Sequence, residues 1–303
     1  MAYAAHLDAP VQVTLDELKA LEAISPDSPG ELSALSNEHG ESLVLGLLEK
    51  GLLLNDSEQH ARWREREQLV RDVAWWPPAA IAMTHGRWSD VDIGARNERG
   101  LMMSSQDMVD AFGSAPEAEY RRTENSETLA LSKPKNSAFN ELLAKRKTCR
   151  NFDPDQTISA EDLATMLHRV WGAIGTLELA PGAVAVKKNS PAGGGLHATE
   201  AYVLVQRAEG LRPGIYHYLP MRHALEPMHF SSQEDMRTLM YQCVAGQDWF
   251  QDVPVMVVMA ARFDRLFWKY RRHTKAWRVV HLDVGHLSQT MYLSAADLGL
   301  GAF

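Results

Sequence analysis

Residues 190–205 read SPAGGGLHATEAYVLV, a glycine-rich turn that leads into a run of apolar and β-prone residues. The glycines at 193–195 allow the backbone to approach a flat ligand closely, with peptide N–H groups free to meet it. The run from Tyr202 to Val205 predicts a buried strand. The stretch is neither a P-loop, because no Gly-Lys-Ser/Thr follows, nor a GxGxxG dinucleotide fingerprint. A merely flexible loop is the alternative explanation.

The segments after this stretch predict more strands and a long helix. Gly214 to Tyr218 and Arg222 to Met228 read as a hairpin, and Val253 to Ala260 is typical of a central strand covered on both faces. A helix is predicted to begin at Ser159, and another covers His281 to Leu298. The C-terminal part is therefore predicted to be an α+β body around a covered sheet.

A basic segment precedes these elements. Residues 146–152 read RKTCRNF and follow a helix that is predicted from Phe139, Leu142 and Leu143. Three cations and a hydroxyl within five residues can bind a phosphate through charge-assisted hydrogen bonds. A solvated basic stretch is the alternative explanation.

Lys269 and Tyr270 stand next to Trp268, with three arginines close by at 271, 272 and 278. Repulsion from cations and desolvation by aromatic rings disfavour the charged form of a lysine. We therefore expect the pKa of Lys269 to fall towards the range of a general base. A basic surface turn is the alternative explanation.

Taken in order, these segments resemble the SagB-type dehydrogenases of the FMN-dependent nitroreductase superfamily. The resemblance covers about residues 137–303 and includes the two segments above together with GIYHY at 214–218, KY at 269–270, GHLSQ at 285–289, YL at 292–293 and GLG at 299–301. With its unusual N-terminal half, the chain is most similar to the peptide maturation dehydrogenase branch. The resemblance implies a nitroreductase-like fold, in which helices flank a central mixed, mostly antiparallel sheet.

The same resemblance implies a homodimer that binds FMN at the subunit interface and oxidises azoline rings in a ribosomally synthesised peptide to azoles. Lys269 and Tyr270 match the family's catalytic pair, in which one residue removes a Cα proton while flavin N5 accepts the hydride. The implied partners are a modified precursor peptide and a cyclodehydratase or another maturation enzyme. The residues implied to bind FMN are Arg146, Lys147, Thr148 and Arg150 for the phosphate and ribityl chain, and Pro191, Ala192, Gly193 and Gly195 for the flavin.

Two departures from the family pattern stand out. The family usually continues beyond Gly-Leu-Gly with a glycine-rich flavin segment and an arm that embraces the partner subunit. This sequence stops at Phe303, so the FMN domain, residues 136–303, is expected to be shortened at its C-terminus. The family's loop often has an asparagine where this chain has Gly195, so flavin contacts there are expected to rest on the backbone alone.

Residues 1–60 are expected to form an acidic, winged-helix-like domain. They carry eleven Asp or Glu against two Lys, a charge of −9 in a chain whose net charge is −8. The predicted pattern begins with a short strand at 11–13 and a helix capped by Thr14 and Glu17. Two more helices follow, one from Pro29 and one over Glu41 to Lys50, and then the apolar residues 52–54. Such a charge disfavours nucleic acid as a partner, so we expect the domain to bind a peptide or a partner protein, or only to pack.

Residues 61–135 are expected to be a helical or irregular connector, with a helix from Trp63 to Val73 and a polar segment over 104–135. No apolar stretch approaches the roughly 18 residues that a membrane span needs, and no signal peptide is readable. Two cysteines make no disulfide framework, which favours the cytoplasm. Twelve histidines form no HExxH motif, so no metal is expected.

Two other functions compete with the peptide dehydrogenase. One is an NAD(P)H-dependent nitro or flavin reductase that acts on small molecules. The other is a non-catalytic peptide-binding partner that kept the fold and lost the flavin. Lys269-Tyr270 and the extra N-terminal domain favour the peptide dehydrogenase, because a small-molecule reductase needs neither.

Overall fold

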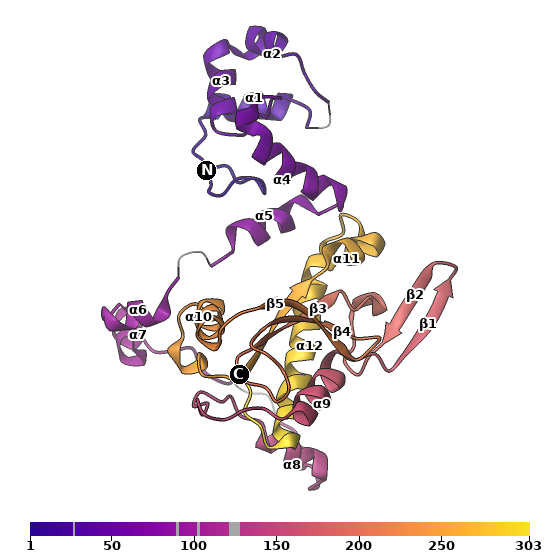
Figure 1. The fold of residues 1–303 in the computed structure, drawn as a ribbon. Helices are drawn as coiled ribbons and strands as arrows, with labels where there is room; N and C mark the ends of the chain where they lie inside the picture. The colour runs from indigo at the N-terminus through magenta and orange to yellow at the C-terminus, as the bar shows by residue number, and fades with distance from the viewer. Residues whose placement is uncertain (27, 89–90, 102–103, 121–127) are drawn as a thin grey trace. The chain divides into compact units, whose positions relative to one another are not determined.

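The structure, a computed structural model, describes residues 1–26, 28–88, 91–101, 104–120 and 128–303 (Figure 1). The chain divides into two compact units, which we call the N-terminal unit, Met1–Ser89 with Ala261–Leu282, and the sheet unit, Asp90–Ala260 with Asp283–Phe303. The long helix α12 (Thr274–Leu298) contributes residues to both. The segment that contains Lys269 and Tyr270 thus groups with the N-terminal residues.

The N-terminal unit is helical. Its elements are α1 (Leu15–Ala23), α2 (Leu32–His39), α3 (Glu41–Glu49), the 3₁₀ turn η1 (Glu58–His60), α4 (Ala61–Asp72), α5 (Pro77–His85), α11 (Phe263–Tyr270) and the start of α12. The predicted capping box of α1 is present, because Thr14 Oγ1 accepts the Glu17 N–H and the Glu17 carboxylate accepts the Thr14 N–H. The expected start of α2 at Pro29 is wrong. Glu31 is its N-cap, since Gly30 immediately before it disfavours helical backbone.

The predicted strands of this unit are largely absent. Val11 forms only an isolated antiparallel bridge with Ala2. Leu52 and Leu53 form no strand, because their N–H groups both bond to the Leu47 carbonyl and so satisfy the end of α3. The described part of residues 1–60 therefore forms helices without a two-stranded wing.

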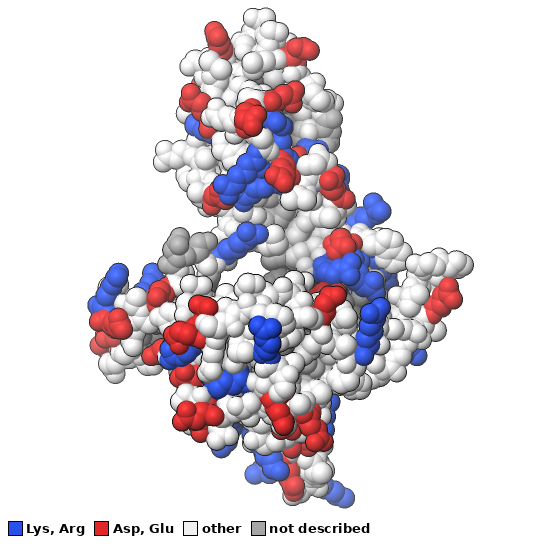
Figure 2. Space-filling view, viewed as in Figure 1, with Lys and Arg blue, Asp and Glu red and all other residues white. Residues whose placement is uncertain are grey.

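The acidic charge of residues 1–60 is partly balanced by α4. Arg66 pairs with Asp8 at 2.7 Å, and the Arg71 guanidinium donates to the Pro26 carbonyl at 2.9 Å. The hydrogen bond and charge of Arg66 hold the pKa of Asp8 below its ordinary value. Figure 2 shows acidic and basic side chains side by side on this unit. The helix that was assigned to the connector therefore belongs, by its contacts, with the acidic residues.

The sheet unit is built on four strands in the order β5-β4-β3-β6. They are β3 (Thr199–Val205), β4 (Gly214–Leu219), β5 (Ala224–Phe230) and β6 (Val255–Ala261), of which β3–β4 and β4–β5 pair antiparallel. The predicted hairpin is confirmed. The expectation that Val253 to Ala260 forms a central strand is wrong, because β6 ends the strand order of the described sheet. A continuous apolar run indicates that both faces of a strand are covered, but it does not indicate where the strand lies within the sheet.

Helices flank both faces of this sheet (Figure 1). Alternate β3 residues such as Val203 and Val205 share one core cluster with Val170 of α9 and Leu287 of α12, whereas Leu204 packs with Met240 of α10. This alternation is the period of two that a strand imposes. The helices of the unit are α6 (Ile93–Glu98), α7 (Ser105–Phe112), α8 (Ala138–Lys145), α9 (Ala160–Trp171), α10 (Gln233–Cys243) and the rest of α12, with 3₁₀ turns η2 (Gly193–Gly195) and η3 (Asp248–Phe250).

Several elements of this unit were not expected, among them α6, α7, α10 and two strands. α7 lies inside the polar segment 104–135 and begins with a capping box of Ser104 and Asp107. The strands β1 (Gly175–Ala180) and β2 (Ala183–Lys187) form a separate antiparallel hairpin. Residues 89–90, 102–103 and 121–127 of the expected connector lie outside the described residues. In the described ranges, no helix combines the length and apolar character needed to cross a membrane.

Candidate active site

The basic segment leaves α8 and runs along the C-terminal residues of the chain. Arg146 is the C-cap of α8, and its guanidinium carbon lies 5.5 Å from the centroid of the Tyr292 ring on α12. Thr148 forms a parallel bridge with Ala302, and the Cys149 N–H donates to the Ala302 carbonyl at 2.8 Å. A Cβ on Gly301 would lie 2.7 Å from Cys149 Sγ, so this close approach requires the glycine. The segment is therefore extended and held in place.

The cations of this segment are accessible to a ligand. Lys147 and Arg150 are exposed and Arg146 is half-buried. Among the described residues, no carboxylate pairs with any of the three. Cations without a carboxylate partner, beside the Thr148 hydroxyl, form a suitable site for a phosphate. The assignment of these residues to phosphate binding stays a prediction.

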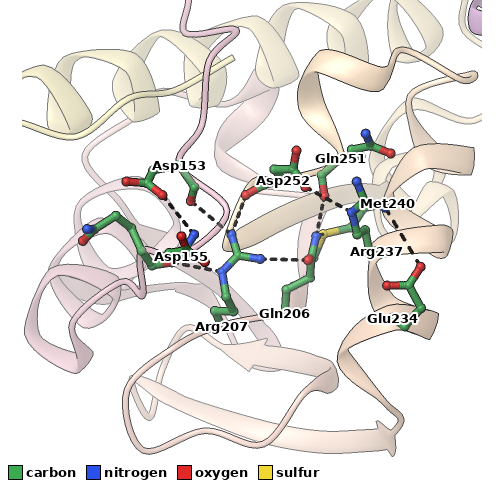
Figure 3. Close-up of polar contacts among 10 residues, drawn as sticks. Asp153, Asp155, Gln206, Arg207, Glu234, Arg237, Met240, Gln251 and Asp252 are labelled. Atoms are coloured by element: carbon green, nitrogen blue, oxygen red, sulfur yellow. Dashed lines mark hydrogen bonds and ion pairs between the residues drawn. The ribbon is translucent and has the colours of Figure 1, made fainter.

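The turn after the segment is fixed by a network of polar contacts (Figure 3). Arg207 donates from Nε to the Gln156 carbonyl at 3.0 Å and from a terminal nitrogen to Gln206 Oε1 at 3.0 Å. Gln206, which is only 2% exposed, donates in turn to the Gln251 carbonyl at 2.6 Å. The end of β3 thereby anchors both the turn at 153–156 and the loop before β6.

The glycine-rich loop is a fixed 3₁₀ turn and not a flexible connection. Gly194 and Gly195 have φ of 68° and 69°, a left-handed backbone that favours glycine. Ser190 Oγ lies 2.7 Å from Thr290 Oγ1 on α12, and the Gly193 N–H donates to Asp283 Oδ1 at 2.9 Å. Pro191 and Ala192 lie between these two anchors. The loop and the basic segment therefore both contact the sheet-unit part of α12.

One expectation about this loop is wrong. The N–H groups of Gly193 and Gly195 are not free to meet a ligand, because the first bonds to Asp283 and the second donates to the Ala192 carbonyl at 3.0 Å. What the loop offers is open space, since a Cβ built on Gly195 would have no atom within 4 Å. A flat ligand could therefore approach the backbone at Gly195 without meeting a side chain.

Asp283 is a site residue that the sequence reasoning missed. It is 6% exposed, and burial raises the pKa of its carboxyl, against the opposing effects of the Gly193 N–H and of His286. The available signal was an acidic residue inside the helical pattern of residues 281–298, where charged groups are costly to bury. Its hydrogen bond to the loop accounts for its position.

An apolar pocket of about 650 Å³ borders the basic segment. Cys149 and Phe152 line it together with residues from α9, β6 and the C-terminal stretch 299–303. Trp171, also in the lining, is 2% exposed, and its indole N–H has no hydrogen-bond partner among the described residues. The volume lies within the range of small-molecule sites.

Lys269 and Tyr270 lie in the N-terminal unit, at the last turn of α11. Lys269 is exposed and Tyr270 is half-buried. The Lys269 Nζ lies 5.6 Å from the centroid of the Tyr270 ring, and Lys275 Nζ, which the sequence analysis did not single out, lies 5.3 Å from it. The tyrosine therefore has two ammonium groups close to its ring, whereas the other eight predicted site residues belong to the sheet unit.

The residues of the sheet unit fit FMN in two respects. The unpaired cations of the basic segment suit its phosphate, and the side-chain-free surface at Gly195 suits a flat ring system. Arg146, Lys147, Thr148 and Arg150 would hold the phosphate end, and residues 191–195 would border the ring.

The C-terminal half of the chain is similar to known proteins. The model of the nitroreductase family matches residues 143–303. MJ1384 of Methanocaldococcus jannaschii, which is named for the nitroreductase family, is 26% identical over 161 residues, or 53% of this chain and 74% of that protein. The trifolitoxin-processing protein TfxB of Rhizobium leguminosarum bv. trifolii is 28% identical over 116 residues, or 38% of this chain and 31% of that protein.

The microcin B17-processing protein McbC of Escherichia coli is 27% identical over 121 residues, or 38% of this chain and 42% of that protein. The matches span less than half the length of the two peptide-processing relatives. The family model, in contrast, covers more than half of this chain, including the basic segment, the glycine-rich loop and the whole four-stranded sheet. This chain therefore belongs to the nitroreductase family.

Proposed function

We propose that the protein is an FMN-dependent dehydrogenase that acts in the maturation of a ribosomally synthesised peptide and oxidises its azoline rings to azoles. The observation that carries the proposal is the arrangement on α12. One stretch of this helix contacts the cationic segment through Tyr292 and the glycine-rich loop through Asp283 and Thr290. A cation cluster and a flat open surface on one helix suit a ligand with a phosphate at one end and a ring at the other.

The relatives support the peptide as substrate. TfxB and McbC are named for the processing of trifolitoxin and microcin B17. Each of them matches 38% of this chain. We extend peptide processing to this chain on that basis, together with a cyclodehydratase or another maturation enzyme as a partner and a homodimer as the assembly.

The residues of this chain have separate roles in the proposed reaction. Bound FMN would supply the hydride acceptor that oxidation of a ring carbon requires. Arg146, Lys147 and Arg150 bind the phosphate and fix the position of the cofactor. Lys269 or Tyr270 takes the proton that leaves the substrate, and the exposed position of Lys269 makes it accessible to a large substrate. Asp283 keeps the loop at the ring in a single conformation.

The test is co-expression of the full chain with a precursor peptide and its cyclodehydratase. Mass spectrometry should then show each azoline ring losing the mass of two hydrogen atoms, and the purified protein should be yellow. A yellow protein that reduces nitroaromatic compounds with NAD(P)H and leaves azolines unchanged would favour the small-molecule reductase. A colourless protein that binds the peptide without oxidising it would favour the non-catalytic partner.

A further inference from the structure

The helix that carries Lys269 and Tyr270 packs on Trp75, a residue of the corner between α4 and α5. Trp75 is 7% exposed, and its ring centroid lies 4.3 Å from that of Phe263 and 4.8 Å from that of Phe267, both on α11. Trp277, at the start of α12, lies 6.0 Å from Trp75. A single indole therefore contacts both helices that flank the turn at residues 271–273.

A backbone hydrogen bond fixes the same junction. The Arg272 N–H donates to the Ala74 carbonyl at 2.9 Å. Ala74 and Arg272 both have left-handed backbone, with φ of 55° and 47°, which is rare outside glycine. Strained residues of this kind persist only where the surroundings determine their conformation. Here the two strained residues face each other across one hydrogen bond.

The amphipathic character of α11 explains what this junction does. Leu266 and Phe267 are buried on one side of the helix, whereas Lys269 is exposed. Tyr270 follows Phe267 by three residues and therefore lies one turn beyond the ring that packs on Trp75. Any rotation of α11 that moved Lys269 and Tyr270 would have to displace Phe263 and Phe267 from the indole.

We propose that Trp75 is a positioning residue for Lys269 and Tyr270, so that the N-terminal helices hold the helix of the catalytic pair. This inference rests on the proposed function for the roles of Lys269 and Tyr270. It assigns to residues 1–89 a task in the oxidation itself, besides any binding of a peptide. It also explains why α11 groups with these residues and not with the sheet.

The experiment compares five variants of the full chain with the wild type. Trp75→Ala removes the contact with α11, and Trp75→Phe keeps an aromatic ring there. Arg272→Pro removes the N–H donor and the left-handed backbone, whereas Arg272→Gly keeps both. The matched control is Trp88→Ala, because Trp88 belongs to the same unit and is 73% exposed.

The first measurement is the rate of tryptic cleavage after Lys269, a site that all the variants keep, and it needs neither flavin nor substrate. Trp75→Ala and Arg272→Pro should raise this rate about tenfold or more, because the turn opens more often. Trp75→Phe, Arg272→Gly and Trp88→Ala should stay close to the wild type. Unchanged cleavage in Trp75→Ala would overturn the proposal, whatever the activity of the protein.

The second measurement is turnover of a thiazoline-containing peptide, with flavin content recorded from the visible spectrum. Trp75→Ala should lower kcat by about 10²-fold, the cost of a small misplacement of catalytic groups, with flavin content and KM nearly unchanged. Trp75→Phe should restore most of kcat. Wild-type kcat in Trp75→Ala, or loss of flavin together with activity, would contradict a positioning role. A wild type without turnover would refute the proposed function while the cleavage result still stands.

Discussion

The carboxylate of Asp283 accepts the backbone N–H of Gly193 at 2.9 Å, and so one turn of α12 determines the conformation of the glycine-rich loop. The loop has a second tie to α12 through Ser190 and Thr290. A buried carboxylate is a costly anchor, since burial disfavours its charged form and raises its pKa. We infer that Asp283 is buried at this place because its hydrogen bond holds the glycine-rich loop in position.

Replacing Asp283 tests this anchor. Asp283→Ala leaves the Gly193 N–H without an acceptor and should lower the free energy of unfolding by about 1–3 kcal/mol. Asp283→Asn keeps an oxygen acceptor without the buried charge and should be close to neutral. Urea unfolding of both variants measures the difference. Equal losses in the two variants would show that the charge, and not the hydrogen bond, is what matters.

The buried carboxyl of Asp283 also predicts that the stability of the protein depends on pH. Because the pKa of Asp283 is raised in the folded protein, the folded state binds this proton more tightly than the unfolded chain does. This contribution is fully present below the unfolded pKa and is lost as the pH rises through the raised value. Asp283→Asn should therefore remove a fall in stability that the wild type shows over that interval, as followed by thermal unfolding at several pH values.

Flavin binding should depend on the cations of the basic segment. Arg146→Ala and Arg150→Ala should each weaken FMN binding by about 10- to 100-fold, the usual range for a hydrogen bond to a charged group, and the double variant should be colourless. Arg212→Ala is the matched control, because it removes the same charge elsewhere in the sheet unit. The guanidinium carbon of Arg212 lies 4.2 Å from the centroid of the Phe230 ring on β5. Retention of stoichiometric flavin in the double variant would refute the phosphate assignment.

Lys269 and Tyr270 should affect turnover and not flavin content. Lys269→Ala should lower the rate of azoline oxidation by about 10²- to 10⁴-fold, the usual contribution of a general base, and Tyr270→Phe should slow it. Lys275→Ala is the informative comparison, since Lys275 lies as close to the Tyr270 ring as Lys269 does. If Lys275→Ala has the larger effect, the base has been assigned to the wrong lysine.

The N-terminal unit should lose stability in acid. Lys50 Nζ lies 2.6 Å and 2.8 Å from the two carboxylate oxygens of Glu17, which is 7% exposed. This hydrogen bond, the Thr14 cap and the charge of Lys50 hold the pKa of Glu17 below its ordinary value. The stabilisation is therefore present above the unfolded pKa and disappears as the pH falls through the lowered one.

Two variants check that interaction. Glu17→Gln should flatten the acid limb of the stability curve for α1 and α3, as measured by circular dichroism or hydrogen exchange. Lys19→Met is the control, because Lys19 pairs with Asp16 at 3.5 Å on the exposed side of α1, where ion pairs contribute little. A Glu17→Gln curve that parallels the wild type would show that another carboxylate determines the acid response.

The sequence by itself predicted several of the elements, among them the hairpin β4–β5 and helices that begin at capping residues. Capping residues such as Thr14 and Ser159, and the apolar run at residues 202–205, act locally, so their signals survive without knowledge of the fold. The order of the motifs was enough to indicate the nitroreductase family, which the family match confirms. The hairpin β1–β2 and helix α7 were missed, although Ser104 and Asp107 form a capping box at the start of α7, a local signal that the sequence contains.

Only the tertiary structure decided which segments share a neighbour. The bond between Asp283 and Gly193 joins residues 90 positions apart, and the contact of Trp75 with Phe263 and Phe267 joins positions separated by most of the chain. The sequence also could not predict the position of a strand within the sheet. β6 has the composition of a central strand, yet it lies at the end of the strand order in the described sheet. Local propensity depends on a few neighbouring residues, whereas these relationships depend on how distant elements pack, which no short window of sequence contains.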